Sequence, residues 1–155
     1  ASAAGPQSIL DTDQALLWLE PEPELVGRCI LVADDELNIR RDMARILDQL
    51  GCNVTLCANG AEIIEQLQLA SAGNTPPHLV ISDIKMPDYN GYEVFRDCHE
   101  RFPDVPVILM TGFGYDPNHS IVRAGQEGMQ SVLFKPFKTA QLVEAVKKAC
   151  GIICN

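Results

Sequence analysis

Five short strand-like runs alternate with five segments of helical periodicity, and this alternation constrains the fold more than any other feature of the sequence. The runs cover 29–33, 53–57, 78–82, 105–110 and 131–134, and the segments that follow them cover 36–51, 61–70, 91–102, 118–128 and 139–149. A short, continuous apolar run is typical of a strand that is covered on both faces, as in a parallel sheet. The pattern therefore predicts an α/β fold with a doubly wound, five-stranded parallel sheet and helices on both faces.

Residues 28–150 contain the whole of this alternation, and we predict that they form one domain. Residues 1–27 are small, polar and acidic around the apolar island "ALLWL", and they end in "EPEPE", where repeated proline discourages a helix. We interpret residues 1–27 as a linker or as the tail of an upstream domain, and residues 151–155 as a C-terminal tail.

The charge balance argues against some classes of function. The chain has 12 Lys and Arg against 21 Asp and Glu, which gives a net charge of -9. Because nucleic-acid binding relies on clustered positive charge, we expect no direct contact with nucleic acid. No apolar stretch approaches the roughly 20 residues that span a bilayer, and no signal peptide opens the sequence. The segment is therefore expected to be cytoplasmic and to make no membrane contact of its own.

The cysteines and histidines do not form a metal-binding or disulfide pattern. None of the 6 Cys residues forms a CxxC pair, and none of the 3 His residues stands at zinc-site spacing from a cysteine. We expect free thiols and ordinary surface or half-buried histidines.

Polar side chains stand at the ends of four of the five expected strands. Asp34 and Asp35 follow the first run, Asp83 the third, Thr111 the fourth and Lys135 the fifth. In a parallel sheet all strands point their C-terminal ends at the same edge, where ligands bind in a crevice. We therefore expect these side chains to converge at one site.

Each of these residues also has an ordinary structural explanation. An aspartate after a strand often caps the next helix, and Asp35 is well placed to cap a helix that begins near Leu37. Thr and Lys at strand ends are usually solvated. Polar residues at four strand ends along a single edge are harder to explain in this way, although capping by Asp35 remains an open alternative.

The chemistry of the expected cluster favours a divalent cation and a phosphoryl group. Three neighbouring carboxylates raise one another's pKa unless a cation lies among them. An all-oxygen set that leaves positions for water and phosphate suits Mg²⁺ better than zinc. Lys135 and the Thr111 hydroxyl can then bind phosphoryl oxygens, and Asp83 can accept the phosphoryl group as an acyl phosphate.

Four motifs, in this order and at these separations, resemble the receiver domain of two-component response regulators: "VADDE", "LVISDIKMPDYNGYEVF", "PVILMTG" and "FKPF". The resemblance covers residues 28 to about 150. It implies a flavodoxin-like (βα)5 fold. It also implies that Asp83 takes a phosphoryl group from phosphohistidine on a histidine kinase or a histidine phosphotransfer protein.

The resemblance further implies which residues hold Mg²⁺ and phosphate. Mg²⁺ would be bound by Asp35, Asp83 and the main-chain carbonyl of Lys85, with Asp34 acting at longer range or through water. Thr111 and Lys135 would bind the phosphoryl oxygens. Gly112 would leave space for phosphate to enter, and the Lys135–Pro136 peptide bond would be cis.

The sequence departs from the family pattern beside this lysine. The aromatic residue expected three positions before Lys135 is Val132, and Phe134 stands immediately before the lysine instead. Thr111 could still draw inward on phosphorylation and shift the helix expected around 118–126, but without a ring to rotate. We therefore expect a muted or differently routed output.

Some residues around the site have a functional and an ordinary interpretation that are equally open. Lys85 and Phe113 either tune the lifetime of the phosphate or are a solvated lysine and an apolar contact. Arg40, Arg41 and Arg45 on the first helix form either a docking patch for the phosphohistidine donor or a solvated face with local ion pairs. Pairing with a second copy of the chain is also left open.

The predicted function is that of a phosphorylation-controlled binding module, which catalyses its own phosphorylation but turns over no external substrate. One alternative is a receiver that acts as a scaffold without phosphorylation. Another is a Mg²⁺-dependent hydrolase with an aspartyl-phosphate intermediate, but such enzymes carry a second Asp two residues after the nucleophile, where this chain has Lys85. Because "ALLWLEP" faintly resembles the last strand of a kinase ATP-binding domain, we favour the C-terminal receiver of a hybrid sensor histidine kinase over a stand-alone receiver.

Overall fold

The computed structural model describes residues 18–112 and 130–152, and five parallel strands form one sheet in it, in the order β2-β1-β3-β4-β5. The strands are β1 (Cys29–Ala33), β2 (Asn53–Cys57), β3 (Leu79–Asp83), β4 (Val107–Thr111) and β5 (Gln130–Phe134). This confirms the predicted five-stranded parallel sheet. Strand β2 lies on one side of β1, and β3, β4 and β5 follow on the other side. This is the doubly wound arrangement expected from the sequence.

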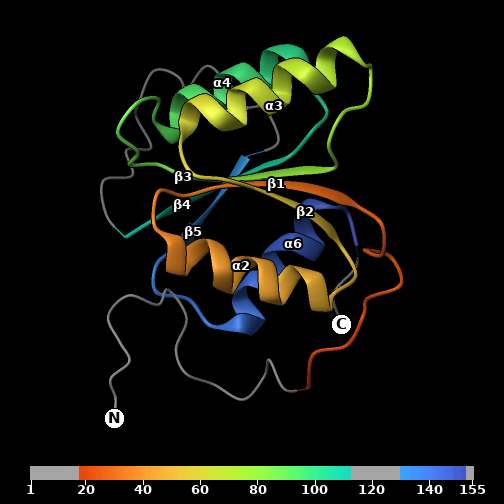
Figure 1. Cartoon of the computed structure of the whole chain (residues 1–155). Helices are drawn as coiled ribbons and strands as arrows, with labels where there is room; N and C mark the ends of the chain where they lie inside the picture. Colours follow the sequence, from red (N-terminus) through yellow and green to blue (C-terminus); the bar gives the residue numbers. More distant parts are fainter. Residues whose placement is uncertain (1–17, 113–129, 153–155) are drawn as a thin grey trace.

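Helices cover both faces of the sheet (Figure 1). The described helices are α2 (Leu37–Gln49), α3 (Gly60–Ala72), α4 (Gly91–Arg101) and α6 (Thr139–Ala149). The pair α3 and α4 lies on one side of the sheet, and α2 and α6 lie on the other (Figure 1). The helix expected at 118–128 falls outside the described residues.

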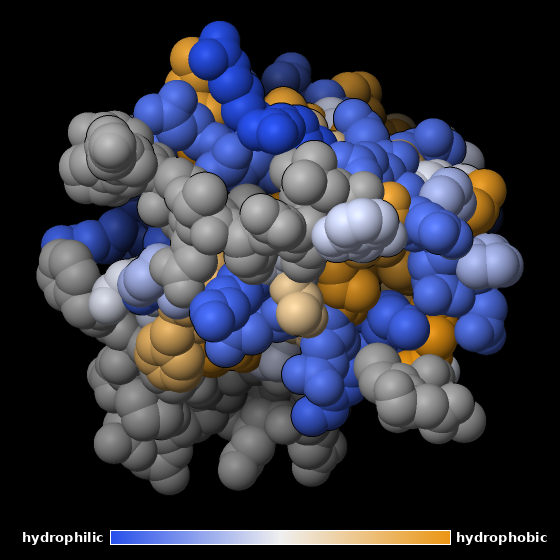
Figure 2. Space-filling view, turned by 90° about the horizontal axis from the view of Figure 1, so that it is seen from below, coloured by the Kyte–Doolittle hydropathy of each residue, from blue (hydrophilic) through white to orange (hydrophobic). Residues whose placement is uncertain are grey.

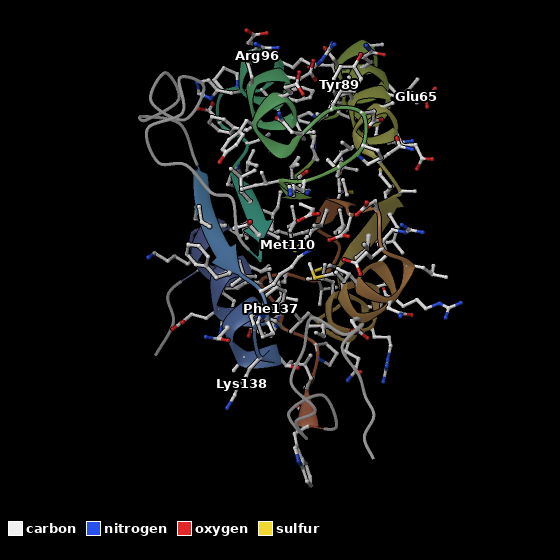
Figure 3. All side chains as sticks on the ribbon, turned by 90° about the vertical axis from the view of Figure 1, so that its left-hand side faces the viewer. Glu65, Tyr89, Arg96, Met110, Phe137 and Lys138 are labelled. Atoms are coloured by element: carbon white, nitrogen blue, oxygen red, sulfur yellow. The ribbon has the colours of Figure 1, made fainter. Side chains whose placement is uncertain are left out.

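The two faces of the sheet form two hydrophobic clusters. Ile30, Val32, Ile81 and Met110 point toward α2 and α6, and Met110 and Phe137 of this cluster are labelled in Figure 3. The intervening strand residues, among them Leu31, Val80 and Leu109, belong to the cluster under α3 and α4. Because successive strand side chains point to opposite faces and both faces are covered, every residue of β3 and β4 is buried.

Some predicted element boundaries were wrong by one or two residues. Asp83 and Thr111 are the last residues of β3 and β4, whereas the predicted strands end one residue before them. Helix α3 extends through Ala72, two residues beyond the predicted helical segment 61–70. The helix begins after an Asn59 side chain that accepts a hydrogen bond from the Glu62 N–H, and it ends at Gly73.

A short segment before β1 packs onto the domain. The side chain of Leu25 is completely buried in the cluster with α2 and α6. The Glu22 N–H donates to the Leu50 carbonyl at 3.0 Å, the Gly27 N–H donates to the Gly51 carbonyl at 2.9 Å, and Lys147 lies 3.4 Å from the Glu22 carboxylate. The division of the chain at residue 28 stays a prediction, but the residues just before it are part of the packed structure.

One described face of the molecule is largely hydrophilic and the described cysteines are unpaired, as the charged composition and the cysteine spacing indicate. On the face shown in Figure 2, hydrophilic residues surround small, separate apolar areas. Five described cysteines are free thiols, as expected, and Cys154 falls outside the described residues. Within 18–112 and 130–152, no helix has both the length and the apolar character needed to cross a bilayer.

Candidate functional site

The sheet places the polar strand ends beside one another. Strand β3 lies between β1 and β4, and the register pairs Ser82 with Ala33 and Asp83 with Met110. Asp34 therefore emerges directly beside the end of β3. On the other side, Thr111 pairs with Phe134, and the Lys135 N–H donates to the Thr111 carbonyl at 2.8 Å.

Lys135 connects the two sides of this edge. Its ammonium lies 2.9 Å from Oδ2 of Asp34 and 3.1 Å from Oδ1 of Asp83. Only 13% of the Lys135 side chain is exposed, so the ion pairs are shielded from solvent. Three residues that are distant in the sequence thus meet in one partly buried cluster.

Asp34 is held at four points. Its Oδ1 accepts a hydrogen bond from the Glu36 N–H at 2.9 Å, and its Oδ2 accepts from Lys135. Its main-chain carbonyl accepts from Nη1 of Arg40 at 2.7 Å, and its own N–H donates to the Cys57 carbonyl at 3.1 Å. Since Asp34 is also fully buried, it is a fixed acceptor that keeps the Lys135 ammonium beside Asp83.

The acidic residues have the composition of a magnesium site. Carboxylate oxygens of Asp34, Asp35 and Asp83 lie within 4.8 Å of one another. Asp35 is exposed, whereas Asp83 is only 6% exposed, so the cluster opens to solvent on the Asp35 side. Hard oxygen ligands with solvent access fit Mg²⁺, which keeps several water ligands.

Without a bound cation, the cluster has three carboxylates and, among the described residues, only one ammonium, that of Lys135. Burial and the neighbouring Asp34 charge raise the pKa of Asp83, Lys135 opposes both, and the net result is a pKa of about 6. Burial alone would lower the pKa of Lys135, but the neighbouring Asp34 and Asp83 carboxylates outweigh it and raise that pKa. A cation that contacts Asp83 would stabilise its ionised form.

The loop after Asp83 folds back closely on the strand. The Gly91 N–H donates to the Ile84 carbonyl at 2.9 Å. A Cβ atom at Gly91 would lie 2.7 Å from the Asp83 carbonyl oxygen and 2.8 Å from Cα of Ile84, so this position requires glycine. Helix α4 then starts with a capping box, in which Asn90 and Glu93 each bind the other's main-chain N–H. Residues 84–90, which include Lys85, are therefore fixed at both ends.

The structure does not support capping by Asp35. The N-cap residue of α2 is Glu36, and it makes no side-chain capping hydrogen bond. The Glu36 N–H is instead satisfied by Asp34, which leaves Asp35 exposed in the acidic cluster. The carboxylate two residues before Glu36 is sufficient to satisfy this N–H, and the sequence pattern does not distinguish it from the carboxylate of Asp35.

The predicted arginine patch was partly wrong. Arg40 is half-buried because its guanidinium turns back to the Asp34 carbonyl, so it is not part of an exposed patch. Arg41 and Arg45 are exposed, and Arg45 lies 4.0 Å from Asp42, one helical turn away. The contact of Arg40 with the site was not predicted, although its position one turn into the helix after the acidic motif was a usable signal.

The remaining predicted residues lie where the motifs place them. Thr111 is buried, at 2% exposure, at the end of β4. A Cβ atom at Gly112 would meet no atom of residues 18–112 and 130–152 within 4 Å. The Lys135–Pro136 peptide bond is cis, as expected.

Val132 packs partly against the α3 and α4 cluster, whereas Phe134 is 59% exposed. Phe113 falls outside the described residues.

The family model of the response regulator receiver domain matches residues 30–147. The chain therefore belongs to this family, whose members act in two-component signal transduction.

Individual relatives agree with this assignment. The chain is 34% identical, over 120 residues, to the C4-dicarboxylate transport transcriptional regulatory protein DctD of Rhizobium meliloti, and the match covers 77% of this chain and 25% of DctD. It is 34% identical, over 122 residues, to the response regulator receiver protein CpdR of Brucella abortus, covering 77% of this chain and 93% of CpdR. The fold matches the chemotaxis protein CheY4 of Vibrio cholerae with a TM-score of 0.68 at 22% identity, over 80% of this chain and 99% of CheY4. The chain thus spans about a quarter of the length of DctD and nearly all of CpdR.

Proposed function

We propose that this receiver domain accepts a phosphoryl group on Asp83 from a phosphohistidine in a two-component phosphorelay. The observation that carries the proposal is the position of Lys135, which lies 2.9 Å from Asp34 and 3.1 Å from Asp83 beside a third carboxylate, Asp35. Once the three acidic residues hold a divalent cation, that cation and the lysine supply the positive charge needed to bring an anionic phosphoryl group to a carboxylate.

Each residue has a role in this transfer. A carboxylate oxygen of Asp83 attacks the phosphorus atom, the bond from phosphorus to the histidine nitrogen breaks, and an acyl phosphate forms on Asp83. Lys135 neutralises charge on one phosphoryl oxygen while Asp34 keeps its ammonium in place. The Thr111 hydroxyl donates to another phosphoryl oxygen. Asp35, Asp83 and the Lys85 carbonyl would hold Mg²⁺, which would supply positive charge beside the acceptor carboxylate and the phosphoryl group.

The wider role follows from the same proposal. Receiver domains take their phosphoryl groups from histidine kinases or phosphotransfer proteins, and we propose such a donor for this chain. Arg41 and Arg45 are exposed on α2 and remain candidates for its docking. The chain then catalyses its own phosphorylation, acts on no external substrate and works on the cytoplasmic side. A hybrid kinase parent, with the kinase activity elsewhere in that parent, belongs to this proposal as well.

The test is phosphorylation with acetyl phosphate and Mg²⁺, followed by intact mass spectrometry. We expect the mass of one phosphoryl group on the wild type, no addition when EDTA replaces Mg²⁺, and no addition on Asp83→Asn. Asp104→Asn is the matched control, because it changes the same charge at an exposed site in the loop before β4. A wild type that stays unmodified with both acetyl phosphate and phosphohistidine donors would favour the unphosphorylated scaffold instead.

The hydrolase alternative gains no support from the site. The position two residues after Asp83 is an exposed lysine, Lys85, whereas that chemistry calls for a second carboxylate. Membership of the receiver family also argues against a hydrolase.

A further inference from the structure

A carboxylate outside the acidic cluster binds the start of a neighbouring helix. Oδ1 of Asp88, in the loop between β3 and α4, accepts a hydrogen bond from the Gly60 N–H at 3.0 Å, and Oδ2 accepts from the Ala61 N–H at 2.8 Å. These are the first two N–H groups of α3, which have no partner within the helix. The next N–H, of Glu62, goes to Asn59. Asp88 therefore completes the capping of α3 from a different part of the chain.

The charge of Asp88 suits this contact. Burial alone would raise the pKa of Asp88, but hydrogen bonds from the N–H groups of Ala61, Tyr89 and Gly60 outweigh it and lower that pKa. The carboxylate is ionised at neutral pH, and the N-terminus of a helix attracts negative charge. Both oxygens can thus accept hydrogen bonds at once, which an amide in the same place cannot do.

The backbones of the loop and the helix also touch directly. A Cβ atom at Gly60 would lie 2.5 Å from the Tyr89 carbonyl oxygen and 2.6 Å from Cβ of Tyr89. Tyr89, labelled in Figure 3, lies where α3 and α4 come together. A side chain at Gly60 would therefore push the loop away from α3, with no change in charge.

The same loop carries the expected main-chain magnesium ligand. It leaves β3 at Asp83, passes through Lys85 and reaches Asp88 before it returns to Gly91, which packs on the Asp83 carbonyl. Lys85 thus lies between the attachment to β3 and the attachment to α3. Since Mg²⁺ demands near-ideal ligand geometry, the position of the Lys85 carbonyl matters for its affinity.

We infer that Asp88 is a positioning residue for magnesium: by tying the 84–90 loop to the N-terminus of α3, it holds the Lys85 carbonyl in place to act as a ligand. The inference rests on the proposed function, because it assumes that Mg²⁺ binds at Asp35 and Asp83. It goes beyond that function by making the start of α3 a part of the metal site.

The first test measures Mg²⁺ affinity without phosphorylation. The Kd for MgCl₂ is obtained from an NMR titration of the wild type, Asp88→Asn and Asp104→Asn. Loss of the two-point attachment is expected to raise the Kd on the order of fivefold in Asp88→Asn. Asp104→Asn makes the same charge change in an exposed loop at the opposite end of the sheet, and its Kd is expected to match the wild type.

The second test moves the loop without changing charge. Gly60→Ala is expected to raise the Kd by a similar factor, because its methyl group meets the Tyr89 backbone. Gly73→Ala is the matched control at the other end of α3, where the nearest atom would be 3.5 Å away. If Gly60→Ala does not fold, hydrogen exchange of the 84–90 amides in Asp88→Asn replaces it, with faster exchange expected.

The outcomes separate this inference from the proposed function. A wild type that binds no Mg²⁺ overturns the proposed function and the inference with it. A wild type that binds Mg²⁺, with variants that bind it equally well but unfold more easily, gives Asp88 a purely structural role and overturns the inference alone. A raised Kd in Asp88→Asn with no change in Gly60→Ala, or with unchanged exchange of the loop, shows a simple effect of charge and also overturns it.

Discussion

Arg40 supports the acidic site through the main chain. Its guanidinium donates to the Asp34 carbonyl at 2.7 Å, at the residue that holds the Lys135 ammonium. A charged donor makes a stronger hydrogen bond than a neutral one, and this one is half-buried. Arg40 thus stabilises the turn from β1 into α2 and leaves the carboxylates free for other partners.

Replacing Arg40 tests this role. In Arg40→Ala we expect the free energy of unfolding to fall by about 1.5–3 kcal/mol, because the Asp34 carbonyl loses a charged donor. Arg41→Ala, one position along the same helix, removes an exposed charge and is expected to change stability by less than about 0.5 kcal/mol. Urea unfolding of both variants measures the difference. Equal losses would mean that Arg40 acts only as surface charge.

The pKa of Asp83 predicts a pH dependence of stability in the absence of metal. Its folded-state pKa is about 6 against an ordinary 3.8, so the folded protein holds this proton more tightly than the unfolded chain. The resulting stabilisation is fully present below pH 3.8 and is lost as the pH rises through about 6. Its size is at most about 3 kcal/mol at about 1.4 kcal/mol for each pH unit.

The measurement compares the wild type with Asp83→Asn in EDTA across this pH range. The free energy of unfolding of the wild type, relative to the variant, is expected to fall from pH 4 to pH 7, and the variant is expected to be the more stable protein at pH 7. The comparison removes the contributions of titrating groups that do not interact with Asp83. Two curves that stay parallel would show that Asp83 has an ordinary pKa.

Among the elements, β3 and β4 were the easiest to predict, because both of their faces are buried and their sequences are apolar as far as Ile81 and Met110. Their ends were misplaced because Asp83 and Thr111 continue the strand while carrying polar side chains. The packing of Leu25 was not predictable in the same way. An isolated leucine among prolines and glutamates has no periodicity that would indicate burial.

The segment before β1 is expected to contribute strongly to stability. Leu25→Ala removes a fully buried side chain, and we expect it to cost about 2–5 kcal/mol. Val26→Ala, at the next position, changes a side chain that is 56% exposed and is expected to cost much less. Chemical unfolding of the two variants gives the comparison. Similar small losses would show that the segment is only loosely attached in solution.

At the scale of the whole molecule, Mg²⁺ is expected to stabilise the fold. A ligand that binds only the folded state adds RT ln(1 + [L]/Kd), which is about 1.4 kcal/mol at ten times the Kd. The unfolding midpoint of the wild type should therefore rise with MgCl₂ and fall again with EDTA. In Asp83→Asn most of the rise should be lost. The same concentration of NaCl serves as the control for ionic strength, and an equal rise in NaCl would contradict specific binding.

The sequence was sufficient to predict the fold class and the residues that meet at the site. Asp34, Asp83 and Lys135 could be placed together because parallel strands bring their C-terminal ends to one edge. The supporting contacts could not be predicted. The hydrogen bonds of Asp88 to α3 depend on the path of a loop, and that of Arg40 depends on the rotamer of one long side chain. Neither depends on periodicity or on strand order.

The burial of Leu25 has a practical consequence for exchanging this domain between signalling proteins. The family match begins at residue 30, and a fusion designed on homology alone would start there. Such a chimera would discard a buried leucine and the ion pair between Glu22 and Lys147 that joins the segment to the last helix. A junction placed before Leu19, which packs against the same cluster, keeps the cooperative unit whole. The segment that must be transferred as one folded unit is therefore longer than the segment that matches the family model.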